Sequence, residues 1–73
     1  MNQTTRIQKD LNMFEENYKT LPNKKITSPQ KKTTILAHQY YQDAQYYLEK
    51  KDLFTAFGCI NYAHGLLDAI IKF

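Results

Sequence analysis

The sequence predicts a small all-α protein folded as a three-helix up-and-down bundle. Apolar residues recur at a helical period in three segments, and turn or capping residues separate those segments. Only 2 Gly and 2 Pro interrupt the 73 residues. We expect helices at about residues 4–21, 29–50 and 52–72, in a single helical domain that spans residues 1–73. A chain this short buries only about 60% of its unfolded surface, so its core must be packed economically.

The first segment carries one narrow apolar stripe. Steps of four and three residues along the chain place its members on one face of a helix. They are Ile7, Leu11, Phe14, Tyr18 and Leu21. Pro22 should end this helix, because its ring removes an amide donor and disfavours helical angles in the preceding residue.

The second segment begins with a capping signal. Thr27 or Ser28 supplies the hydroxyl, and Pro29 suits the first helical position. Small residues and tyrosines form its packing face, namely Ala37, Tyr40, Tyr41, Ala44, Tyr47 and Leu48. The alanines leave room for a neighbouring helix to approach closely.

The third segment follows a very short connection, so the second and third helices should form an antiparallel hairpin. Positive charge on Lys50 and Lys51 suits the end of one helix, and Asp52 can cap the next. The inner face of the last helix is broad and comprises Leu53, Ala56, Phe57, Ile60, Ala63, His64, Leu67, Ile70 and Ile71. Polar residues within this segment argue against a membrane span.

The single cysteine bears on the compartment. Cys59 cannot form an internal disulfide or a multi-thiolate metal site, which fits a reducing environment. The N-terminal residues lack the apolar run of a secretory signal. We therefore expect a cytoplasmic protein that does not associate with membranes. A catalytic role for Cys59 would need a base and an electropositive pocket, whereas its expected neighbours are apolar, so packing is the preferred interpretation.

No catalytic pattern stands out. The sequence has no glycine-rich phosphate loop, nucleophile elbow or paired-carboxylate arrangement. His38 and His64 lie equally far along the chain from Lys51, so the hairpin should set them at one level. His38, however, falls roughly 120° from the middle of its helix's packing face. We expect a core His64 and a separate flanking His38, with no metal, no cofactor and no enzymatic activity.

Residues 40–69 carry a recognisable pattern. Its most specific parts are the runs Asn61-Tyr62-Ala63-His64-Gly65 and Leu67-Asp68-Ala69, preceded by Tyr40-Tyr41-Gln42-Asp43-Ala44. This pattern resembles the archaeal domain of unknown function 357 family. The resemblance implies a compact three-helix up-and-down bundle, an archaeal origin and no assigned activity. Two positions depart from the family, which has Gly-Asp where this chain has Lys51-Asp52, and often Trp in place of Leu66.

The hairpin is also similar to one tetratricopeptide-type helix pair, with small residues at Ala44 and Ala56. A single pair of this kind cannot bury its own core. A repeat protein is therefore the less favoured interpretation.

Two surface strips suggest a protein interface. On the second helix the strip is Ile35, Gln39, Gln42 and Tyr46, and on the third it is Gly58, Asn61, Gly65 and Asp68. Each glycine costs about 1 kcal/mol in a helix interior. Close packing against these glycines, either by the first helix or by a second chain, should compensate for this loss of stability. The main hypothesis is a non-catalytic module for protein–protein interaction or self-association through the outer surface of the hairpin.

A lysine-rich loop supports an alternative. Residues 19–32 contain no acid, and the lysines proposed to contact phosphate are Lys24, Lys25, Lys31 and Lys32. Such a segment suits phosphate or RNA binding that is sensitive to salt. It lacks the arginine and aromatic residues that commonly recognise bases. Nucleic acid is therefore the second choice of partner.

Overall fold

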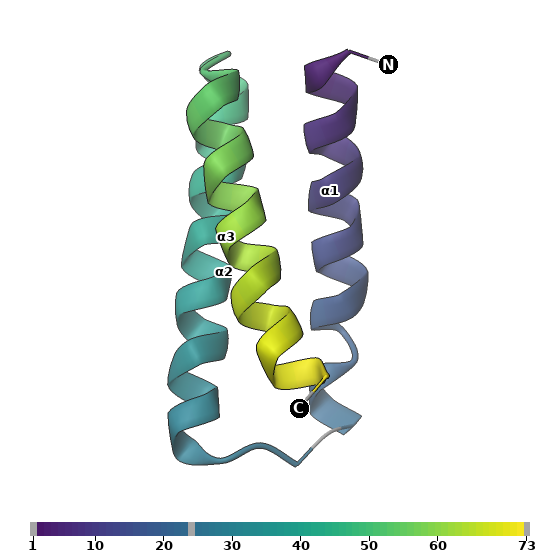
Figure 1. Cartoon of the computed structure of the whole chain (residues 1–73), viewed down its shortest axis with the longest axis vertical. Coiled ribbons are helices and arrows are strands. Elements are labelled where there is room, and N and C mark those ends of the chain that lie inside the picture. Colours follow the sequence, from purple (N-terminus) through teal and green to yellow (C-terminus); the bar gives the residue numbers. More distant parts are fainter. Residues whose placement is uncertain (1, 24, 73) are drawn as a thin grey trace.

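Three α-helices follow one another along the chain and run in alternating directions (Figure 1). The computed structural model describes residues 2–23 and 25–72. It contains α1 (Gln3–Tyr18), a short 3₁₀ turn η1 (Leu21–Asn23), α2 (Ser28–Glu49) and α3 (Leu53–Ile71). The prediction of an all-α, three-helix bundle is confirmed, and the bounds of α2 and α3 agree with the sequence to within one residue.

The end of α1 differs from the prediction. The helix begins after Asn2, whose side chain accepts a hydrogen bond from the Thr5 amide at 2.8 Å. It ends at Tyr18 and not at Leu21. The amide and the hydroxyl of Thr20 both donate to the Asn17 carbonyl, at 3.1 Å and 2.7 Å, and close the last turn. Leu21 still reaches the core from η1 and is only 8% exposed.

The start of α2 is fixed by a capping box. The Gln30 amide donates to the Thr27 hydroxyl at 3.3 Å, and the Thr27 amide donates to the Gln30 side-chain oxygen at 2.8 Å. Two amides that the helix leaves unpaired are thereby satisfied. Thr27 is the cap, Ser28 is the first helical residue and Pro29 is the second.

The turn between α2 and α3 is a Schellman motif. Lys51 has a positive φ of 62°. The Asp52 amide donates to the Tyr47 carbonyl at 2.9 Å, and the Lys51 amide donates to the Leu48 carbonyl at 3.0 Å. As expected, Asp52 caps α3, since its carboxylate accepts from the Thr55 amide at 3.2 Å.

Lys51→Gly is expected to raise the free energy of unfolding by about 1 kcal/mol. A residue with a Cβ is strained in the left-handed region, which glycine adopts freely. Urea denaturation of the variant and the parent chain measures the change. Lys50→Gly is the matched control, because Lys50 has helical angles and should gain nothing. A loss of stability in Lys51→Gly would contradict the expectation.

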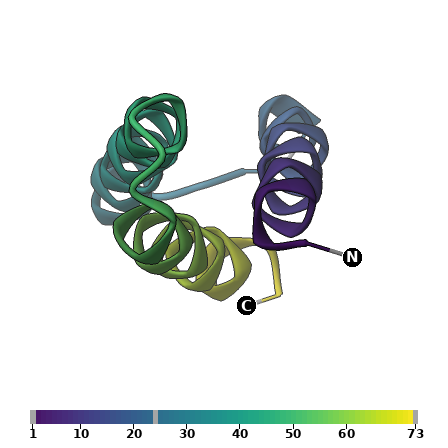
Figure 2. The ribbon, with the colours of Figure 1, turned by 90° about the horizontal axis from the view of Figure 1, so that it is seen from above.

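The core lies around α3, which packs against both other helices, whereas α1 and α2 contact each other far less (Figure 2). Fully buried alanines on α2 and α3 allow these two helices to approach closely; they are Ala37, Ala44, Ala56 and Ala63. The largest fully buried side chains are Ile7, Leu11, Phe14, Ile60 and Leu67. These positions confirm the apolar faces inferred from the sequence.

The most apolar helix is α3. With 19 residues and a mean hydropathy of 1.2, it is long and apolar enough to cross a membrane by those two criteria alone. Its buried residues, Ala56, Ile60, Ala63, Leu67 and Ile70, belong to the core of the bundle.

Candidate functional site

The two histidines lie on either side of an aromatic stack. Half-buried His64 donates through Nε2 to the Asp10 carbonyl at 2.8 Å, and its ring meets Phe14 edge to face at 5.9 Å. His38 contacts Tyr41, with 5.5 Å between ring centroids. Phe14 and Tyr41 stack on each other at 4.8 Å between the two histidines. The two histidines are separate, as expected, but both residues are half-buried, so His64 is not more deeply placed in the core than His38 by this measure.

Metal-ligating side chains do not gather in the part of the chain that the structure describes. There, no group of three or more His, Cys, Asp or Glu residues is placed to hold a metal ion. Cys59 is half-buried, and burial raises the pKa of its thiol, with smaller contributions from Asp43 and Asp52. A raised pKa leaves little thiolate near neutral pH. This supports a packing role for Cys59.

A polar contact joins α1 to α2. The Tyr41 hydroxyl donates to the Glu15 carboxylate, and the Gln45 side chain donates to the same hydroxyl at 3.1 Å. Burial, together with the hydrogen bond to Glu15 and its negative charge, raises the pKa of Tyr41 to about 12. The sequence placed Tyr41 in the core but could not indicate this partner, because the spacing does not tell which acid of α1 faces α2.

This contact predicts a loss of stability at alkaline pH. An unfolded tyrosine releases its proton near pH 10, whereas folded Tyr41, with a pKa of about 12, retains it. The contribution of Tyr41 to stability is therefore complete below pH 10 and falls as the pH rises from 10 to 12.

Tyr41→Phe should remove this part of the pH dependence. Urea unfolding of both proteins between pH 10 and pH 12 measures the difference in their free energies of unfolding. Lysines also titrate in this range, but they do so in both proteins, so their effect cancels in the difference. Tyr46→Phe, at an exposed position, is the control and should behave like the parent chain. Identical pH profiles for the parent chain and Tyr41→Phe would contradict the expectation.

An apolar patch covers the outer line of contact between α2 and α3. The Tyr40 and Tyr62 rings meet there, with centroids 4.6 Å apart. Leu36 lies one helical turn from Tyr40, and Leu66 one turn from Tyr62. Leu36 is 40% exposed and Tyr62 is 53% exposed, while Tyr40 and Leu66 are half-buried. We refer to Leu36, Tyr40, Tyr62 and Leu66 as the seam patch.

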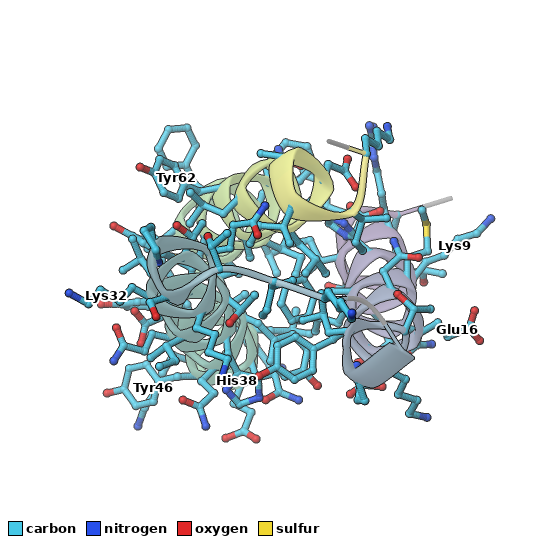
Figure 3. All side chains as sticks on the ribbon, turned by 90° about the horizontal axis from the view of Figure 1, so that it is seen from below. Lys9, Glu16, Lys32, His38, Tyr46 and Tyr62 are labelled. Atoms are coloured by element: carbon cyan, nitrogen blue, oxygen red, sulfur yellow. The ribbon has the colours of Figure 1, made fainter. Side chains whose placement is uncertain are left out.

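The two strips selected from the sequence flank the seam patch and do not form one surface. On α2, Ile35, Gln39, Gln42 and Tyr46 are all exposed. On α3, Gly58, Asn61 and Gly65 are exposed, and Asp68 is half-buried with Lys72 at 3.7 Å. Tyr46 and Tyr62 point to different sides of the hairpin (Figure 3). Sequence reasoning missed the seam patch, although Tyr40 and Tyr62 are equally far along the chain from Lys51 and so share one level.

The strip of Gly58, Asn61, Gly65 and Asp68 on α3, called the glycine track below, has no other helix packed against its glycines. Apart from the neighbouring residues and the nearby backbone of α3 itself, a Cβ added to Gly58 or Gly65 would meet no atom within 4 Å. Of the two alternatives for a close approach, packing of the first helix on this track is therefore excluded, and approach by a second chain stays a prediction. Instead, α1 packs beside the track, where Arg6 lies 5.3 Å from the centre of the Phe57 ring and the Asp10 carbonyl meets His64.

The lysines proposed to contact phosphate do not converge on one point. Lys25, Lys31 and Lys32 are exposed, and Lys24 lies outside the described residues. Lys32 points away from the bundle (Figure 3). Lys31 instead lines a cavity at the end of α1 together with Lys19.

Comparison with known proteins identifies the family. A search of curated proteins gave no significant match. A family model described as "Protein of unknown function (DUF357)" matches residues 9–73. The match extends the resemblance seen over residues 40–69 and includes α1 from Lys9 onward, where we recognised no family pattern. This chain belongs to the DUF357 family of proteins of unknown function.

Proposed function

We propose that this protein is a non-catalytic protein-interaction module that binds its partner through the outer surface of the α2–α3 hairpin. One observation carries the proposal. Among the residues that the structure describes, all but one of the large exposed apolar side chains belong to the hairpin. They are Ile35, Leu36, Tyr46, Phe54 and Tyr62, and the exception is Met13 on α1.

The composition of this surface supports the proposal. Aromatic residues are enriched in the buried centres of protein interfaces, and polar residues form their rims. The seam patch supplies a centre in which the Tyr40 and Tyr62 rings brace each other. Gln39 and Asn61 are exposed, lie one position along the chain from Tyr40 and Tyr62, and offer hydrogen bonds that adapt to a partner. The two strips found in the sequence thus serve as the rim.

Affinity capture tests the proposal. The tagged chain is incubated with an extract of the source organism that has been treated with nuclease. We expect a protein that survives nuclease, is retained by the parent chain and is lost with the double variant Leu36→Ser/Tyr62→Ser. Met13→Ser is the matched control, since it removes an apolar side chain that is 49% exposed on α1. Light scattering on the same variants tests self-association. A strictly monomeric chain that retains no protein would refute the proposal.

Nucleic-acid binding is the second candidate. The observation in its favour is that Lys25, Lys31 and Lys32 are exposed and form no ion pair within residues 2–23 and 25–72. Binding of this kind would weaken steeply with salt and depend little on sequence. Labelled RNA at low ionic strength tests it, with Lys31→Ala/Lys32→Ala as the weakened variant. If no salt-dependent binding appears, this candidate fails.

A further inference from the structure

A cavity of about 610 Å³ lies between the end of α1 and the start of α2. Its apolar lining comes from Tyr18, Leu21, Pro22 and Ile26, and Lys19 and Lys31 also line it. Small-ligand pockets commonly measure about 300–1,000 Å³ and are mostly apolar with a few polar groups. The size and the lining therefore suit a small organic molecule.

The apolar part of this lining is held in place. Leu21 is buried, while Tyr18 and Ile26 are half-buried and packed against the core. The bonds from Thr20 to Asn17 close one side of the connection, and the capping box at Thr27 closes the other. Hydrogen-bonded local structure therefore flanks this open depression at Thr20 and at Thr27.

The polar part of the lining is cationic. Lys19 and Lys31 are exposed, and neither forms an ion pair with any residue that the structure describes. The connecting segment, residues 19–32, contains no acid that would compete for them. An anion in this cavity would therefore have two lysine residues beside it, next to an apolar surface.

We propose that this cavity binds an amphipathic anion, an aliphatic chain or aromatic ring that ends in a carboxylate. The apolar part contacts Tyr18, Leu21 and Ile26, and the carboxylate lies near Lys19 and Lys31. A nucleic-acid backbone fits less well, because the lining is mainly apolar and Lys32 points elsewhere. This site is separate from the outer hairpin surface, so it stands or fails independently of the proposed function.

Titration of the ¹⁵N-labelled full-length chain with octanoate, followed by nuclear magnetic resonance, tests the proposal. We expect saturable shifts of the amides of residues 18–21, 26, 31 and 34. Octan-1-ol, octylammonium and inorganic phosphate are the comparison compounds, and each should bind more weakly because it lacks either the chain or the negative charge. Absent shifts, shifts elsewhere, or equal binding of octylammonium or phosphate would overturn the proposal.

Two exposed lysines provide a matched pair of variants. Lys31→Ala should weaken octanoate binding about fivefold, the effect of losing one exposed ion pair. Lys32→Ala removes the same charge one residue away and should leave the affinity unchanged. Ile26→Ser, outside the helices, should also weaken binding about fivefold through lost apolar contact. An equal loss in Lys31→Ala and Lys32→Ala would show only a general effect of charge and would refute the site.

Discussion

Phe14→Ala is expected to lower the free energy of unfolding by about 3–5 kcal/mol, the usual cost of removing a buried phenyl ring. Phe14 is 1% exposed. Its ring contacts Tyr18 on its own helix at 5.7 Å, Tyr41 on α2 at 4.8 Å and His64 on α3 at 5.9 Å. Because α1 and α2 share few other contacts, the cavity left behind should loosen α1 from the hairpin.

Urea denaturation followed by circular dichroism measures this effect. Small domains are stable by only about 5–15 kcal/mol in total, so the variant should unfold at a much lower urea concentration. Met13→Ala is the neighbouring control, with an exposed side chain and an expected change within about 0.5 kcal/mol. Similar losses in the two variants would contradict the central position of Phe14.

The double variant Gly58→Ala/Gly65→Ala is expected to raise the free energy of unfolding by about 2 kcal/mol. Alanine is favoured over glycine by about 1 kcal/mol at each interior helical position. Outside the neighbouring residues and the nearby backbone of α3, no atom lies within 4 Å of either added Cβ, and neither glycine has a positive φ. The two sites are two turns apart and should contribute additively.

Thermal and urea unfolding measure this gain, and Ala69→Gly, at an exposed position of α3, should produce the opposite change. The same double variant also reports on binding. If it is more stable but retains less captured protein, the partner approaches the glycine track closely. A drop in stability would contradict the open track seen in the structure.

The sequence predicted the helices well because their signals are local. The stripe from Ile7 to Tyr18 follows the helical period, and the cap at Thr27 and the hairpin at Lys50 to Asp52 depend on residues next to one another. The end of α1 was less accurate, because the bonds from Thr20 to Asn17 compete with continuation of the helix.

The candidate sites were predicted less well because they depend on how the helices are rotated about their axes. The Tyr41–Glu15 contact and the seam patch each join residues of two helices, and the cavity at Lys19 and Lys31 needs the path of the connecting loop. The glycine argument could not choose between the first helix and a second chain for a related reason. Helix propensity gives the cost of Gly58 and Gly65 but does not identify what, if anything, compensates for it.

The family match adds α1 to the unit that the sequence pattern had restricted to the hairpin. It begins at Lys9 and so includes Leu11 and Phe14, which α1 contributes to the core. The structure likewise makes α1 part of the core, and it adds fully buried Ile7, which lies two residues before the match begins. The three helices therefore form one folding unit.

Chemical-shift mapping of the captured protein on the ¹⁵N-labelled chain tests the central claim most directly. If the hairpin is the contact surface, the largest shifts will lie at Leu36, Tyr40, Tyr62 and Leu66, with smaller ones along the flanking strips. Shifts confined to α1 or to residues 19–32 would contradict the claim and assign the binding activity to another face of the bundle.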